Sequence, residues 1–183
     1  MLAAAWEPGP FVLVGHSLGG LYVQLYAYQH PDEVAGLVLV DPTPEEFSAR
    51  LAQMLESFGT PGPARSPGSP PTVEETSIEQ MRAARRVGTL RPMPLIVLSH
   101  GRADDPSTRP PGWPLMEEER IFRELHEGLA RLVPNGRHVV AEGVGHDIHQ
   151  ERPELVVEAI RQVVAAVEDP SSWGTPVSSR TVA

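Results

Sequence analysis

The chain has 183 residues, which is the length of one domain, and 40% of them are hydrophobic, as is ordinary for a globular protein. No stretch approaches the roughly 20 apolar residues of a membrane helix. The apolar run at the N-terminus is interrupted by Glu7, Pro8 and Gly9, unlike that of an export signal, so a cytoplasmic location is the default expectation. The absence of cysteine excludes disulfides and cysteine zinc sites, and the net charge of −9 argues against nucleic-acid partners.

The first elements predict a parallel sheet. Residues 11–14 form a short apolar run that ends at a glycine, which is typical of a buried parallel strand. Residues 21–30 then show apolar positions at near-helical spacing, and residues 34–40 form a second buried strand. Strand, helix and strand with short connections indicate a βαβ unit.

Residues 42–92 differ from the rest in composition. Two helix-like pieces flank a segment, residues 59–71, whose many prolines and glycines exclude regular structure. We expect this region to form a cap or lid inserted over the sheet.

The strand pattern resumes after the insertion. It predicts a strand at 94–99, a helix that includes 121–133, a strand at 137–141 and a final helix at 153–167. The core of the domain would therefore comprise 1–41 and 93–168, and the Ser-, Thr- and Pro-rich tail 169–183 is predicted to be disordered.

A Gly15-His16-Ser17-Leu18-Gly19-Gly20 motif lies between the first predicted strand and helix. A strand-to-helix turn is the context that a nucleophile elbow requires, and its serine adopts a strained conformation that exposes the hydroxyl. Gly15 and Gly19 would remove side chains that clash where strand and helix approach. The Leu18 amide, at the helix start, would point at a developing oxyanion. The alternatives are a phosphate-binding glycine turn and a plain tight loop.

These residues, from Val14 to Tyr22 and again over 31–41, resemble the α/β-hydrolase family. The resemblance implies that Ser17 is the nucleophile and that the Leu18 amide is half of the oxyanion hole. It covers only the C-terminal half of the family fold, because the elbow strand begins at residue 11. The implied fold class is α/β, a partial α/β-hydrolase fold with a parallel sheet of about four strands, flanking helices and a helical cap. The implied function is hydrolysis of a carboxylic ester or related acyl substrate without a cofactor.

A serine nucleophile needs a base, and the base needs an orienting acid. Of seven histidines, His146 lies in a glycine-flanked loop after a predicted strand, where open α/β sheets place their chemistry. That loop also resembles the histidine loop of the family, so we assign His146 as the base. The alternative is a metal site with Asp147 and His149, but this spacing is no strong signal and no metal is expected.

Two aspartates remain candidates for the acid. Asp104 follows strand 94–99 in a Gly-x-x-Asp arrangement that resembles the usual position in the family. Asp41 ends the preceding strand, from which some members take their acid, and both positions reach the same edge of the sheet. Either could instead serve as a turn or capping residue. We favour Asp104.

A competing hypothesis follows from the unpaired strand at 11–14. With no neighbouring strand before it, its apolar edge would be open to pairing. The chain would then be a catalytically impaired fragment that associates through this edge with another copy, or half of a split hydrolase. The expected partners are a small acyl substrate and this self-association, with no nucleic acid and no membrane span.

Overall fold

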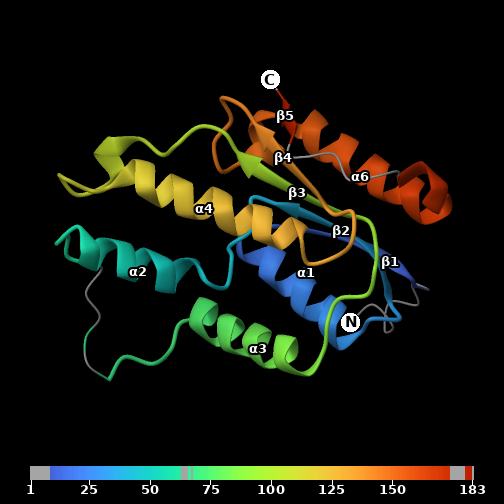
Figure 1. Cartoon of the computed structure of the whole chain (residues 1–183), viewed down its shortest axis with the longest axis horizontal. Coiled ribbons are helices and arrows are strands. Elements are labelled where there is room, and N and C mark those ends of the chain that lie inside the picture. Colours follow the sequence, from blue (N-terminus) through green and yellow to red (C-terminus); the bar gives the residue numbers. More distant parts are fainter. Residues whose placement is uncertain (1–8, 63–65, 67, 174–179, 183) are drawn as a thin grey trace.

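The computed structural model describes residues 9–62, 66, 68–173 and 180–182. Within them, five parallel strands form one sheet in the order β1-β2-β3-β4-β5 (Figure 1). The strands are β1 (Phe11–His16), β2 (Val34–Val40), β3 (Leu95–His100), β4 (Arg137–Ala141) and β5 (Arg180–Val182). The predicted α/β class with a parallel sheet is confirmed, with one strand more than the four expected.

Helices cover both faces of the sheet. They are α1 (Leu18–Gln29), α2 (Phe47–Ser57), α3 (Val73–Val87), α4 (Leu115–Ala130), α5 (Ile148–Glu151) and α6 (Pro153–Glu168). Figure 1 shows α4 on one side of the sheet and α6 on the other. Side chains alternate between faces along a strand, so Leu37 and Leu39 pack in the cluster that includes α1 and α4 residues, whereas Val38 packs with α5 and α6. The sheet thus has two buried faces, which explains its unbroken apolar strands.

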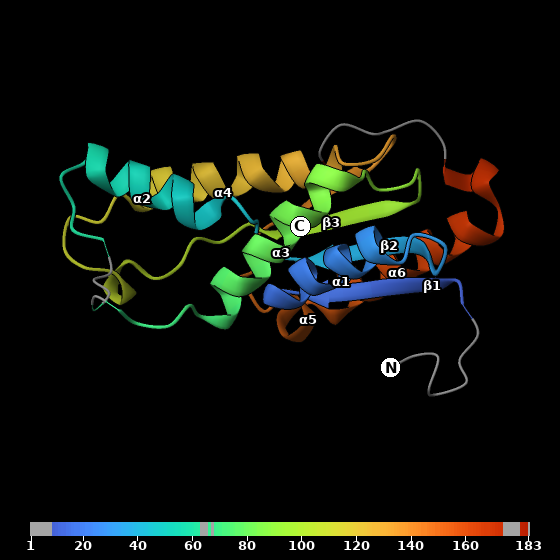
Figure 2. The ribbon, with the colours of Figure 1, turned by 90° about the horizontal axis from the view of Figure 1, so that it is seen from below.

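Two helices of the region predicted to be a cap lie along the core helices. A capping box between Thr72 and Glu75 begins α3, whose Ile78 and Met81 pack in one cluster with Leu21 of α1. The other helix, α2, lies beside α4, and together they extend past the end of the sheet (Figure 2). The description of 42–92 as a cap stays a prediction.

Part of the tail differs from the expected disorder. A 3₁₀ turn at Pro170–Trp173 buries the Trp173 ring against the Arg137 guanidinium, which lies 3.8 Å from the ring centroid. Nε1 of Trp173 donates to Asn135 O at 3.0 Å. Beyond it, β5 pairs with β4. A single aromatic anchor and a strand of three residues are too short to give a periodic signal in sequence. Residues 174–179 and 183 lie outside the described residues.

The opposite edge of the sheet is formed by β1. Among the described residues β1 pairs only with β2, and the Val14 side chain is 42% exposed there. None of the helices in the described ranges is long and apolar enough to cross a membrane.

Candidate active site

The predicted elbow forms where β1 ends at His16 and α1 begins at Leu18. Ser17 lies between them with φ 54° and ψ −126°, a left-handed conformation that is strained for any residue with a side chain. The Ser17 backbone is held by β2 and its following loop, because its N–H donates to Val40 O and its carbonyl accepts from Thr43 N, both at 3.0 Å. Its side chain makes no capping hydrogen bond to α1.

The glycines of the motif have different structural roles. A Cβ added to Gly15 would lie 2.4 Å from the Gly19 carbonyl oxygen, so the expectation for Gly15 is confirmed. The same expectation was wrong for Gly19, where an added Cβ meets no tertiary atom within 4 Å. The second close approach is at Gly20, where a Cβ would lie 2.5 Å from Cβ of Pro42. The strand β1 therefore approaches α1 at Gly15, and the segment after β2 approaches α1 at Gly20.

Asp41 and His146 meet at the carboxyl ends of β2 and β4. The Asp41 carboxylate is fully buried, and its Oδ2 accepts from Nδ1 of His146 at 2.6 Å. This hydrogen bond raises the pKa of His146, although partial burial of the ring opposes the rise. With Nδ1 donating to the carboxylate, Nε2 of His146 carries the lone pair that can accept a proton.

Asp104, the acid favoured from the sequence, has different partners. Its carboxylate is half exposed and accepts from Arg109 Nη2 at 2.9 Å. The next residue, Asp105, caps a 3₁₀ turn through Ser107 N, so this loop contains a turn aspartate of the kind considered above. The structure thus joins Asp41, and not Asp104, to His146 by a hydrogen bond, although both aspartates line the same pocket.

His100 is a further partner of Asp41 that sequence reasoning missed. Its backbone N–H donates to Asp41 Oδ1 at 2.9 Å, and its Nδ1 lies 2.8 Å from Oδ2. On the other side, Nε2 lies 2.9 Å from Glu119 Oε2. The strands β2 and β3 are parallel neighbours, and Asp41 and His100 lie at their carboxyl ends. That placement was the sequence signal from which this contact could have been predicted.

The two carboxylates make His100 a cation. Burial disfavours the charged ring, but the hydrogen bonds to Asp41 and Glu119 outweigh it and raise the pKa of His100 to about 10. Burial alone would raise the pKa of Asp41, yet the hydrogen bonds from His100 and His146 hold it well below its usual range. Asp41 is therefore a buried, ionised carboxylate anchored by one cation and facing a second imidazole.

A neutral histidine lies beneath this pair. Nδ1 of His126 lies 3.9 Å from Asp41 Oδ1, and burial lowers the pKa of His126 to about 4. Its Nδ1 contacts Ser99 Oγ at 2.5 Å and its Nε2 contacts Pro42 O at 2.8 Å. These hydrogen bonds provide partners for both nitrogens of a fully buried ring.

A pocket of about 340 Å³ opens beside the Asp41–His146 pair. This is enough volume for a small organic molecule. The side chains that line it combine aromatic rings with acids and histidines, among them Asp41, Phe47, His100, Glu119, Phe122 and His146.

Comparison with known proteins decides the family. The model of the family described as "Alpha/beta hydrolase family" matches residues 2–159. The chain belongs to this family. The resemblance seen in the motif at Ser17 is thereby confirmed, and the sheet with its elbow is the corresponding fold.

Similar proteins extend beyond this chain in length. Uncharacterized protein YqjL of Bacillus subtilis is 26% identical over 91% of this chain and 61% of its own length. Monoacylglycerol lipase ABHD6 of Rattus norvegicus is 26% identical over 89% of this chain and 57% of its own length. The chain therefore spans about three fifths of these two relatives.

A solved structure shares the fold. A probable hydrolytic enzyme from Pseudomonas aeruginosa PAO1 superposes with a TM-score of 0.52 at 18% identity, over 89% of this chain and 66% of that one.

Proposed function

We propose that this chain hydrolyses carboxylic esters or related acyl substrates through an acyl-enzyme, with Ser17 as nucleophile, His146 as base and Asp41 as acid. Asp41 replaces Asp104, which the sequence favoured. The observation that carries this choice is the 2.6 Å hydrogen bond between the buried Asp41 carboxylate and Nδ1 of His146. The family membership and the strained backbone of Ser17 support the same reading.

In the proposed mechanism, Ser17 Oγ attacks the acyl carbonyl carbon and its proton passes to His146 Nε2. The ionised Asp41 stabilises the imidazolium that forms. The Leu18 amide, at the N-terminus of α1, donates to the oxyanion of the tetrahedral intermediate. His146 then returns the proton to the leaving alcohol. In the second half of the reaction, water attacks the acyl carbonyl carbon and gives a proton to His146, which passes it to Ser17 Oγ as the acid is released.

His100 acts in this proposal as a positioning residue. Its backbone and ring hold both oxygens of Asp41, and its positive charge keeps the carboxylate ionised. Glu119 balances that charge at 2.9 Å, which limits the repulsion between the His100 cation and the imidazolium formed on His146.

The test is hydrolysis of p-nitrophenyl acetate and butyrate. Ser17→Ala and His146→Ala should each lower kcat by about 10³-fold or more, because members of a triad act as a unit. Ser48→Ala, on α2, and His30→Ala, at the end of α1 opposite the elbow, are at exposed positions. They are the matched controls and should retain wild-type kcat. A His146→Ala protein that keeps most of its activity would refute the assignment.

A second candidate function is self-association through β1. It is favoured by the position of β1 at the edge of the sheet formed by the described residues, and by the exposed Val14 on that strand. An unpaired parallel edge offers backbone N–H and C=O groups to another strand, and the proposed occupant is a second copy of this chain. Association and hydrolysis can occur together, so this candidate competes only with the view that the chain acts as a monomer.

A further inference from the structure

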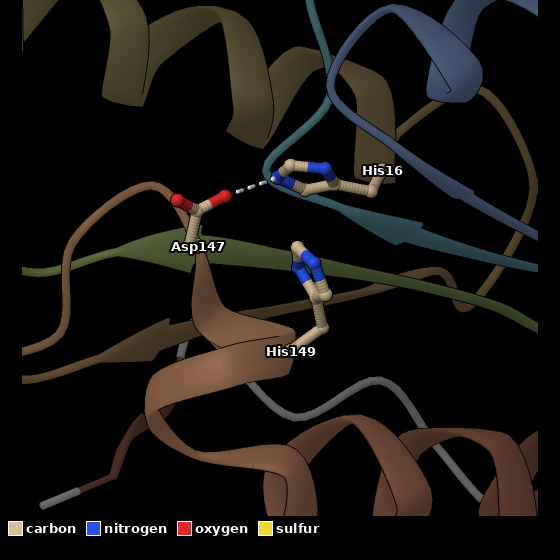
Figure 3. Close-up of side chains that lie close together, drawn as sticks. All are labelled: His16, Asp147 and His149. Atoms are coloured by element: carbon tan, nitrogen blue, oxygen red, sulfur yellow. Dashed lines mark ion pairs between the residues drawn. The ribbon is translucent and has the colours of Figure 1, made fainter.

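A cluster of three metal-ligating side chains lies beside the proposed triad. His16 extends from the end of β1, and Asp147 and His149 come from the loop and short helix after β4 (Figure 3). His16 Nε2 lies 3.8 Å from Asp147 Oδ1, and the centroids of the two imidazole rings are 4.4 Å apart. One ligand atom from each of the three residues lies within 4.8 Å of the others.

These distances are close to those of a tetrahedral zinc site. Ligands about 2.0–2.1 Å from a tetrahedral ion are about 3.3 Å from each other, so the cluster needs to contract by at most about 1.5 Å. Asp147 and His149 are exposed side chains that can move by this amount through rotation about their own bonds, whereas His16 is only partly exposed. Closure therefore needs no change in the sheet.

The donor set selects the kind of ion. Two imidazole nitrogens and one carboxylate oxygen suit Zn²⁺ and the neighbouring divalent transition metals, whereas Mg²⁺ and Ca²⁺ prefer sites made of oxygen. Three protein ligands leave a fourth position for water. Figure 3 shows the three side chains converging from two segments that are 130 residues apart.

We propose that His16, Asp147 and His149 form a binding site for one divalent transition-metal ion of the Zn²⁺ class. His16 Nε2 lies 3.1 Å from the carbonyl oxygen of His146 and cannot donate to that oxygen while it ligates an ion. Binding therefore exchanges a hydrogen bond between the elbow and the histidine loop for a metal bridge between the same two segments.

The position of the site gives the ion a regulatory effect, and this part rests on the proposed function. His16 precedes Ser17 directly, and its ring centroid is 4.6 Å from that of His146. The bridge ties Asp147 and His149, which flank the loop that carries His146, to the residue before Ser17, and so shifts the His146 ring relative to Ser17. The ion should therefore inhibit hydrolysis.

The binding claim is tested by isothermal titration of Zn²⁺ into chelator-treated protein. We expect one ion per chain and a rise in Tm with added Zn²⁺. His149→Ala and Asp147→Asn should each weaken binding by at least about tenfold. His30→Ala is the matched control, because His30 is also a partly exposed histidine beside a carboxylate, Glu33 at 3.5 Å, and it should bind as the wild type does. Unchanged affinity in both cluster variants, or no binding by the wild type, would overturn the proposal.

The regulatory claim is tested separately by ester hydrolysis with and without Zn²⁺. Wild-type hydrolysis should slow at Zn²⁺ concentrations near the titrated Kd and recover with a chelator, and His149→Ala hydrolysis should slow only at concentrations about tenfold higher. A wild type that binds one Zn²⁺ and hydrolyses at an unchanged rate would refute the inhibition. A chain that binds Zn²⁺ but shows no hydrolysis under any condition would refute the proposed function and leave the metal site supported.

Discussion

Replacing Asp41 with Asn tests which aspartate serves the proposed base. The substitution keeps the size of the side chain but removes its charge and one of its acceptors. In the wild type this carboxylate is contacted by His146 Nδ1 at 2.6 Å, by His100 N at 2.9 Å and by His100 Nδ1 at 2.8 Å. An amide cannot serve both imidazoles as an anion does, so His146 is free to adopt the wrong tautomer.

The expected losses differ greatly between the two aspartates. Asp41→Asn should lower kcat by about 10⁴-fold, or about 5 kcal/mol of transition-state stabilisation, as for a triad acid. It should also destabilise the fold by about 3–5 kcal/mol, because the buried His100 cation loses one of its two carboxylates. Asp104→Asn breaks only a half-exposed pair with Arg109 and should change stability by less than about 1 kcal/mol and kcat by less than about threefold.

The assay is the kcat for p-nitrophenyl butyrate, scaled to the folded fraction from urea denaturation of each variant. Measuring stability and activity on the same samples separates loss of the acid from loss of the fold. A larger fall in kcat for Asp104→Asn than for Asp41→Asn would refute the assignment of Asp41.

Three further predictions follow from the packing, the charges and the sheet edge. Gly15→Ala should prevent soluble folding, since its Cβ meets backbone at 2.4 Å, whereas Gly19→Ala should leave Tm within a few degrees; similar yields and Tm values would contradict this. The pKa of His100 is about 10 in the folded chain and ordinarily 6.5. The contribution of the charged His100 to the free energy of unfolding is therefore complete below pH 6.5 and is lost as pH rises towards 10. The wild type should therefore lose about 2 kcal/mol more unfolding free energy than His100→Gln between pH 7 and 9 in urea titrations, and equal pH slopes would refute the charged His100. The wild type should elute as a dimer or larger in size-exclusion chromatography with light scattering, and Val14→Arg, which places a charge on the edge strand, should shift it towards a monomer; a wild-type monomer would contradict association through β1.

Most of the fold was predictable because its signals are local. The apolar run of β2, the near-helical pattern of α1 and the stop at Pro31 lie within about 20 residues and describe one βαβ unit. The strand β5 was not predictable, because three residues carry no periodicity and their pairing depends on β4, about 40 residues away. Trp173 anchors that segment through a contact with Arg137 that only the tertiary structure defines.

The candidate site was predictable to different degrees. Ser17 and His146 lie in loops whose glycines and positions after strands make them candidates from sequence. Asp41 and Asp104 both follow strands, and the sequence cannot tell which one faces inward. The difference arises from Arg109, which holds Asp104 at the surface, and from His100, which fixes Asp41 in the interior. The Asp41–His100 contact joins residues that are far apart in the sequence, and the Asp104–Arg109 contact depends on the conformation of one loop.

The cluster at His16 was missed for the same reason. Asp147 and His149 were considered together from their spacing, but with His146 as the third member. His16 is 130 residues from His146, and only the meeting of the β1 and β4 ends brings its ring to that loop. Parallel strands place their carboxyl ends at one edge, so such clusters are found by comparing the residues that follow each strand.

The most direct test of the central claim is labelling of the folded chain with a fluorophosphonate, followed by mass spectrometry of its peptides. The account predicts one adduct per chain, located on Ser17, and labelling that is nearly abolished in His146→Ala and Asp41→Asn but retained in Asp104→Asn. An adduct on another serine, or labelling of Ser17 that is unaffected by loss of His146, would contradict a Ser17–His146–Asp41 triad.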